Sequence, residues 1–191
     1  MAIKLIVGLG NPGQDYQAHR HNVGFWFCDA LAQLTNSHFK KETKFLGEVT
    51  KANLSGQNIW LLKPTTFMNR SGGSIQSLAN FYKIKPEQIL VVHDELDLNP
   101  GVARLKFSGG HGGHNGLRDT IKALNSQDFF RLRIGIGHPG DKSKVADFVL
   151  HAPNKSEADL IQQALIDALH VVEDIVTGKT EAAMKTLHTQ R

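Results

Sequence analysis

Three short apolar runs restrict the fold of this chain more than any other feature of its sequence. They cover residues 3–7, 89–92 and 132–136. Runs of four or five mainly apolar residues are typical of strands buried in a sheet, because a buried helix needs a longer stretch. Longer segments with apolar residues at helical spacing lie between and after these runs. This order predicts an α/β fold, a three-layer α/β/α sandwich in which helices flank a twisted mixed sheet.

The helices and one hairpin are expected at definite places. Helical spacing of apolar residues covers 22–34, 71–82, 156–178 and 180–187. Ser71 and Ser156 stand at the starts of two of these segments, where a hydroxyl typically caps a helix. The residues between the strand-like segments 48–54 and 59–62 are typical of a turn, which indicates a hairpin.

Length and composition favour one domain. The chain has 191 residues, of which 40% are hydrophobic, and this suits a single domain over residues 1–191 with a real core. Its one cysteine, Cys28, cannot form an internal disulfide and is expected in the core, which fits a cytoplasmic protein. No apolar run approaches the roughly 20 residues that span a bilayer, so we expect no membrane partner.

Charge is unevenly distributed along the chain. The 22 Lys and Arg residues exceed the 18 Asp and Glu residues by only four. Residues 101–145 hold eight of the basic residues and three acidic ones, whereas residues 146–178 hold six acidic residues and one basic one. Separation of this kind makes one face attractive to a polyanion, although charge alone fits a solvated surface of mixed sign equally well.

The segment 8–13, GLGNPG, matches the G-x-G-x-x-G pattern of dinucleotide-binding loops. Those loops open directly into a helix, but Pro12 and Gly13 form a turn signal here, and helical spacing starts only near residue 22. No second strand ends in an acidic residue at the distance that a ribose contact requires. We interpret the segment as a tight loop that places the amide of Asn11 at the carboxyl end of a strand.

A histidine and an aspartate are expected near neighbouring strand ends. His21 directly precedes the helix expected at 22–34, and His93 and Asp94 follow the buried run 89–92. Histidine suits general-base catalysis because its pKa lies near neutrality, and an aspartate that accepts its Nδ1–H fixes the tautomer. Adjacent His93 and Asp94 also occur in metal-dependent phosphohydrolases, which gives a second interpretation.

Two further asparagines mark expected helix starts. Asn69 follows Phe67 and Met68, and its amide is suited to donate to a carbonyl oxygen of a substrate. Asn115 follows a glycine-rich segment whose His111 and His114 have a metal-like spacing. A flexible glycine loop holds metal ligands poorly, so we favour a mobile loop over the site. From the residues alone, we expect a hydrolase of an acyl compound.

Several segments together resemble the bacterial-type peptidyl-tRNA hydrolase family, in order and spacing, over nearly the whole chain. They cover residues 7–16, 20–24, 63–72, 93–98, 109–117, 133–139 and 145–150. The resemblance implies hydrolysis of the ester between a peptide's terminal carboxyl and the 3′-terminal ribose of tRNA. His19 is a small departure, since a hydroxyl residue is common there.

The resemblance also implies roles for individual residues. His21 would activate water, Asp94 would orient it, and Asn11 would contact the peptide. The remaining residues that the resemblance assigns to substrate or tRNA are Tyr16, Phe67, Met68, Asn69, His114 and Asn115. Within the basic segment, the candidate phosphate contacts are Arg104, Lys106 and Arg133. We expect no metal and no cofactor, peptidyl-tRNA as the partner, and a monomer.

Two other functions stay open on sequence grounds. One is a non-catalytic RNA-binding module that uses the basic residues of 101–145, although phosphate binding needs neither His21 with Asp94 nor three asparagines. The other is a metal-dependent phosphohydrolase centred on His93 and Asp94, which the metal content of the purified protein would reveal.

Overall fold

The computed structural model describes residues 2–189, and its strands form one mixed sheet of seven. The strands are β1 (Leu5–Gly8), β2 (Lys40–Glu42), β3 (Gly47–Leu54), β4 (Gln57–Pro64), β5 (Ile89–Glu95), β6 (Ala103–Phe107) and β7 (Phe130–Gly135). Their order across the sheet is β2-β3-β4-β1-β5-β7-β6. The central strands β4, β1, β5 and β7 are parallel, and β2, β3 and β6 add antiparallel pairs toward the edges.

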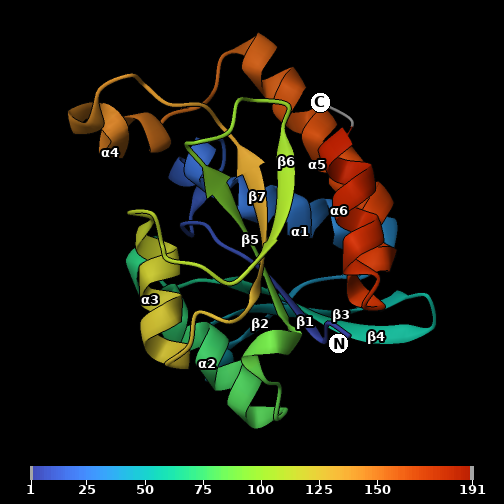
Figure 1. The fold of residues 1–191 in the computed structure, drawn as a ribbon. Helices are drawn as coiled ribbons and strands as arrows, with labels where there is room; N and C mark the ends of the chain where they lie inside the picture. The colour runs from blue at the N-terminus through green and yellow to red at the C-terminus, as the bar shows by residue number, and fades with distance from the viewer. Residues whose placement is uncertain (1, 190–191) are drawn as a thin grey trace.

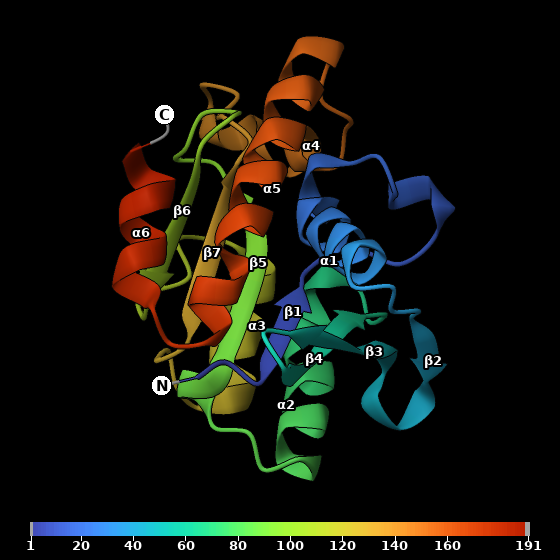
Figure 2. The ribbon, with the colours of Figure 1, turned by 90° about the vertical axis from the view of Figure 1, so that its right-hand side faces the viewer.

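Helices cover both faces of this sheet, as the sequence predicts. Figure 1 shows α2 (Ser71–Phe81) and α3 (Asn115–Leu124) on one side of the strands, with α5 (Lys155–Val176) and α6 (Thr180–Thr189) on the other. Figure 2 shows that α1 (Val23–Leu34) lies on the same side as α5 and α6. The three-layer α/β/α fold is therefore confirmed. Among residues 2–189, no helix combines the length and apolarity that crossing a bilayer requires.

Strand β5 explains why the central strands have continuous apolar sequences. Successive side chains of a strand point to opposite faces, and both faces of β5 are covered by helices. Leu90 and Val92 belong to the core cluster beneath α1, α5 and α6, whereas Ile89 and Val91 belong to the cluster beneath α2 and α3. Every position from Ile89 to Asp94 is buried, so this strand shows no alternation of polar and apolar residues along its first four positions.

The parallel strands also place the loops that carry the candidate site. Strands β4, β1 and β5 are neighbours in register, so their carboxyl ends lie at one edge of the sheet. Asn11 lies in the loop after β1, and Asn69 lies in the loop after β4. Asp94 lies near the end of β5 itself. Ligands of open α/β sheets bind at this edge, because the loops there leave a crevice.

Two predicted helix caps are wrong. Ser71 is the first residue of α2, and its hydroxyl donates to the Met68 carbonyl oxygen at 2.7 Å instead of capping the helix. Helix α5 begins at Lys155, and Asn154 caps it through an oxygen that accepts from the Glu157 backbone N–H at 2.8 Å. Asn154 competes successfully with Ser156 because it also completes a capping box with Glu157.

The start of α1 is pressed against two strand ends at Gly24. A Cβ added to Gly24 would lie 2.6 Å from the Leu9 carbonyl oxygen and closer still to the Val92 carbonyl oxygen. Both contacts are with backbone, which cannot move aside as a flexible side chain would. The close approach fixes the distance between β5 and the helix that His21 precedes.

We expect Gly24→Ala to lower the free energy of unfolding by about 3 kcal/mol, because overpacking against backbone forces the helix away from the sheet. Gly73→Ala is the matched control, since an added Cβ in that position of α2 meets nothing within 4 Å and alanine favours a helix by about 1 kcal/mol over glycine. Urea unfolding of both variants measures the difference. Equal stabilities would contradict the close packing at Gly24.

Candidate active site

Asp94 lies between two histidines at the carboxyl end of β5. Its Oδ2 is 2.8 Å from Nδ1 of His21, and its Oδ1 is 2.7 Å from Nε2 of His114. His21 directly precedes Asn22 and α1, and His114 is the N-cap of α3, so the two rings reach Asp94 from opposite layers of the fold. All three side chains are at least largely buried, which strengthens their electrostatic interaction.

The hydrogen bonds determine which nitrogen atoms of the two rings carry protons. A carboxylate only accepts, so Nδ1 of His21 donates to Asp94 and Nε2 of His21 keeps its lone pair. Nδ1 of His114 accepts from the backbone N–H groups of Gly116 and Leu117, at 3.1 Å and 3.3 Å, so its Nε2 is the donor to Asp94. His21 therefore presents a basic nitrogen, whereas His114 has both nitrogens occupied.

The charges of the pair stabilise one another. Burial lowers the pKa of His21, but the charge of Asp94 and its hydrogen bond outweigh burial and raise that pKa above 6.5. Burial by itself would raise the pKa of Asp94, but attraction to His21 and His114 holds it well below its usual value. Asp94 is therefore ionised throughout the neutral range, and His21 is poised to take up a proton.

His93 has a different role from its neighbour. It is buried at 2% exposure, and its Nδ1 donates to the Asp94 backbone oxygen at 2.8 Å. Burial, together with the charge of His114, lowers the pKa of His93 to about 3, so the ring stays neutral. Because its ring lies across the strand from the Asp94 carboxylate, the pair does not present two ligands to a common cation.

Asn11 is held by two partners in the loop after β1. Its Oδ1 accepts from the Met68 backbone N–H at 2.7 Å. The side chain of Asn22 bonds both backbone groups of Asn11, accepting from its N–H and donating to its oxygen at 2.9 Å each. Within residues 2–189 the Nδ2 of Asn11 makes no hydrogen bond, so this amide offers an oriented donor beside His21.

The sequence did not assign these clamping roles to Asn22 and Met68. Asn22 stands at the N-cap of α1, but its side chain makes no capping bond there. Met68 contributes its backbone N–H to the site, while its side chain is buried in the core beneath α2 and α3. The position of Asn22 next to His21 indicates such a role, because a polar side chain buried beside the base needs a hydrogen-bond partner.

Other predicted site residues lie at the surface, on the loops and helix starts next to those that carry this centre. Asn69 lies just before α2, and Asn115 is the first residue of α3. Both residues are exposed. Phe67 is 52% exposed, and its ring meets the edge of the Tyr16 ring at a centroid distance of 5.9 Å. The structure brings the rings of Tyr16 and Phe67 into contact and the Asn11 side chain onto the Met68 backbone, but it leaves the side-chain amides of Asn69 and Asn115 without hydrogen bonds within residues 2–189.

An arginine anchors the glycine-rich loop that leads to His114. Arg131 is 2% exposed, and its guanidinium donates to the carbonyl oxygens of Gly109 at 2.5 Å and Gly110 at 2.6 Å. A third bond reaches the Gln127 carbonyl oxygen at 3.2 Å. Gly109 has a φ of 118°, which side chains rarely allow, so the loop path at this anchor requires glycine.

The three predicted phosphate contacts lie on the adjoining strands β6 and β7. Arg104 is paired across the strands with Arg133, and Lys106 with Arg131, so these basic side chains share one face. That face is the one Arg131 uses to hold the glycine loop. Arg133 forms an ion pair with Glu95 at 2.9 Å, while Lys106 is exposed.

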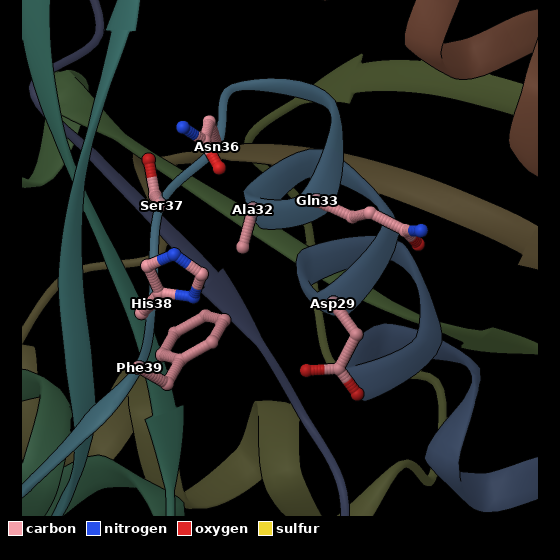
Figure 3. A pocket seen from close by; sticks show the side chains of 7 residues that line it. All are labelled: Asp29, Ala32, Gln33, Asn36, Ser37, His38 and Phe39. Atoms are coloured by element: carbon pink, nitrogen blue, oxygen red, sulfur yellow. The ribbon is translucent and has the colours of Figure 1, made fainter.

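Two hollows open on the surface near α1. One, of about 500 Å³, adjoins the site and is lined by Asn11, Pro12, Gly13, Gln14, Gln17, Asn22, Phe25, Trp26, Asp29, Glu48 and Lys63. The other, of about 340 Å³, is drawn in Figure 3 and lies between the end of α1 and the segment that leads to β2. It contains none of the predicted site residues. Asp29 lines both hollows and accepts from the Lys63 ammonium at 2.5 Å.

Within residues 2–189, His21, Asp94 and His114 also form the one cluster of potential metal ligands, with ligand atoms within 4.8 Å of one another. Two imidazoles and a carboxylate are a ligand set that zinc accepts. Both Asp94 oxygens already accept hydrogen bonds from the rings, so a cation would displace a proton from at least one of them. Cys28 adds no ligand, because burial raises the pKa of its thiol to about 12.

The fold and the site together define an α/β enzyme equipped for hydrolysis, with a buried imidazole–carboxylate pair beside oriented amides at the ends of parallel strands. The sequence profile of the peptidyl-tRNA hydrolase family matches residues 5–191. This chain belongs to the peptidyl-tRNA hydrolase family. The predicted family and enzyme class are thereby confirmed.

Individual relatives agree over the full length. A peptidyl-tRNA hydrolase of Ruthia magnifica subsp. Calyptogena magnifica is 63% identical over 190 residues, which are 100% of both chains. One from Neisseria meningitidis serogroup A is 53% identical over 98% of both chains. The crystal structure of the Acinetobacter baumannii peptidyl-tRNA hydrolase matches with a TM-score of 0.95 and 49% identity, over 98% of this chain and 95% of that one.

We expect the pKa of His21, followed by NMR of its ring carbons, to lie above 6.5 and to fall below that value in Asp94→Asn, since burial alone then acts on the imidazole. Glu173→Gln is the control, because Glu173 bonds Ser55 in the turn before β4, at the opposite end of that strand from the site, and should leave the titration unchanged. A His21 titration that is the same in Asp94→Asn and the parent would contradict the pairing.

Proposed function

We propose that this chain hydrolyses the ester between the carboxyl end of a peptide and the 3′-terminal ribose of tRNA, with His21 as the general base. One observation carries the proposal. The hydrogen bond of 2.8 Å between Nδ1 of His21 and Asp94 leaves Nε2 unprotonated and oriented. Family membership supports the substrate class, and this geometry supports His21 as the group that acts on water.

In the first step, a water oxygen attacks the ester carbonyl carbon while its proton passes to Nε2 of His21. The carbonyl oxygen becomes negatively charged in the tetrahedral intermediate. When the intermediate collapses, the bond to the ribose oxygen breaks, and that oxygen takes the proton from His21. Asp94 stabilises the imidazolium that exists between the two steps, since its carboxylate is ionised and in contact.

Amide donors suit the substrate side of this reaction. Nδ2 of Asn11 is aimed by the bond that its Oδ1 accepts from Met68, so it is suited to donate to a peptide carbonyl oxygen. Asn69 and Asn115 are exposed, and they are proposed to bind and position the ester and the peptide backbone. Amides recognise backbone without regard to side chains, which a substrate of variable peptide sequence requires.

The tRNA is proposed to lie on the other side of the centre. Tyr16 and Phe67 would contact its 3′ end, and His114 would line the cleft while it holds Asp94. The basic side chains of β6 and β7 would bind phosphates. The face that they share lies next to Glu95, which follows Asp94 directly, so it adjoins the site. Phosphate contacts of this kind are independent of sequence, so all tRNAs would be accepted.

We also propose one domain over residues 1–191 that acts as a monomer in the cytoplasm, without metal or cofactor. The supporting observation is that the strands β1, β4, β5, β6 and β7 and the loops after them supply every proposed site group from one chain. Translation, which produces the substrate, takes place in the same compartment.

Two other functions fit less well. A non-catalytic RNA-binding module would use the basic face of β6 and β7, but it gives no reason for a buried carboxylate that two histidines hold. A metal-dependent phosphohydrolase centred on His93 and Asp94 is disfavoured because His93 is buried and bonded to backbone.

We expect His21→Gln to lower kcat for release of N-acetylated amino acid from tRNA by about 10²- to 10⁴-fold, the usual contribution of a general base. The parent should keep its activity in chelator, and its rate should rise with pH through the pKa of His21, because the base must be unprotonated. His170→Gln, on the exposed side of α5, is the control. Full activity of His21→Gln would remove the assigned role, and inactivation by chelator would indicate a metal.

We expect Lys106→Gln to raise KM for the tRNA substrate severalfold and leave kcat unchanged, because it removes one phosphate contact. The slope of log KM against log salt concentration should fall by about 1. Lys155→Gln removes the same charge from the acidic helix α5 and should change neither value. Identical salt slopes for Lys106→Gln and the parent would place the tRNA on another face.

A further inference from the structure

Four aromatic rings form a continuous row that runs from the candidate active site to the segment after α4 (Val145–Val149). The Phe67 and Tyr16 rings meet edge to face at 5.9 Å, and Tyr16 meets His19 in the same way at 5.4 Å. His19 and His151 lie nearly parallel, with an interplanar angle of 19° and centroids 6.4 Å apart. The row therefore continues well beyond the two rings that the family resemblance assigns.

The two histidines are held in place by their surroundings. The guanidinium of Arg20 donates to the carbonyl oxygens of Phe148 at 2.9 Å and His151 at 3.3 Å, and the Arg20 backbone N–H donates to the same His151 oxygen at 3.0 Å. The His151 ring donates through Nδ1 to the Asp147 backbone oxygen at 2.6 Å. The segments that carry His19 and His151 are thus fixed to each other before any ligand binds.

The four rings of the row are not part of the hydrophobic core. None of them belongs to either core cluster of the described chain, and the His151 side chain is 64% exposed. Tyr16 and His19 are half-buried, so part of each ring remains open to solvent. Exposed rings at successive intervals are a platform on which unpaired bases stack, irrespective of base identity.

We infer that His19 and His151 bind the unpaired 3′ end of the tRNA by stacking on a cytidine base that precedes the terminal adenosine. The inference rests on the proposed function, which places the ester, and with it the terminal ribose, at His21. His19 lies two residues before His21 in the chain. A tRNA 3′ end that runs from the ester across Phe67 and Tyr16 therefore reaches His19 and His151 next. This assigns a stacking subsite to a position where the family commonly has a hydroxyl residue.

The test measures binding of the trinucleotide cytidine-cytidine-adenosine and of adenosine monophosphate, which requires no turnover. We expect the double variant His19→Ala/His151→Ala to raise Kd for the trinucleotide about tenfold, the usual effect of losing one stacked base, and to leave Kd for the mononucleotide unchanged. The double variant His19→Phe/His151→Phe should bind the trinucleotide like the parent, because it keeps the planar rings and loses only the ring nitrogens.

The same variants are then assayed on N-acetylated aminoacyl esters of adenosine and of the trinucleotide. KM should rise only for the trinucleotide ester, with kcat unchanged. Equal losses on both esters would overturn the inference in favour of a purely structural histidine pair, and unchanged trinucleotide binding would also overturn it. Trinucleotide binding that depends on the rings, in a parent that hydrolyses neither ester, would support the subsite while refuting the proposed function.

Discussion

The carboxylate of Asp94 accepts one hydrogen bond from each helical layer, and the geometry of the site depends on these two bonds. His21 arrives from the start of α1, and His114 arrives from the N-cap of α3. Within the described chain neither ring has a second side-chain hydrogen-bond partner, and His114 is further oriented by the backbone N–H groups of Gly116 and Leu117. A buried charge with two donors is costly to disturb, since removing either donor leaves part of the carboxylate unsatisfied. The same contact therefore fixes the base and joins the layers.

Around this contact, backbone groups complete the positioning. Asn22 holds Asn11 by its backbone, and the Met68 N–H holds the side-chain oxygen of Asn11, so the segments after the parallel strands β1 and β4 are tied together. Arg131 does the same for the glycine loop with three carbonyl oxygens. The reactive atoms sit on loops, but the loops are positioned by the rigid sheet and by these bonds.

The sequence predicted the fold class and the proximity of His21 and Asp94, because strand ends in a parallel sheet meet at one edge. It could not predict the bond from His114 to Asp94, since the path of the glycine loop depends on positive φ values and on Arg131. The predicted cap at Ser71 is wrong because its hydroxyl donates to the Met68 carbonyl oxygen, and the one at Ser156 is wrong because Asn154 caps α5 instead. Strand β6 was missed because its basic residues interrupt the apolar run.

The alternation of side chains along β5 limits how this protein can vary. Asp94 faces the layer of α1 and meets His21, while His93 faces the opposite layer and stays neutral at a pKa of about 3. A single inserted or deleted residue within β5 would exchange the two, burying a carboxylate where an uncharged ring now packs. The loops at this edge of the sheet can therefore vary in length during evolution, but the number of residues in β5 must stay the same.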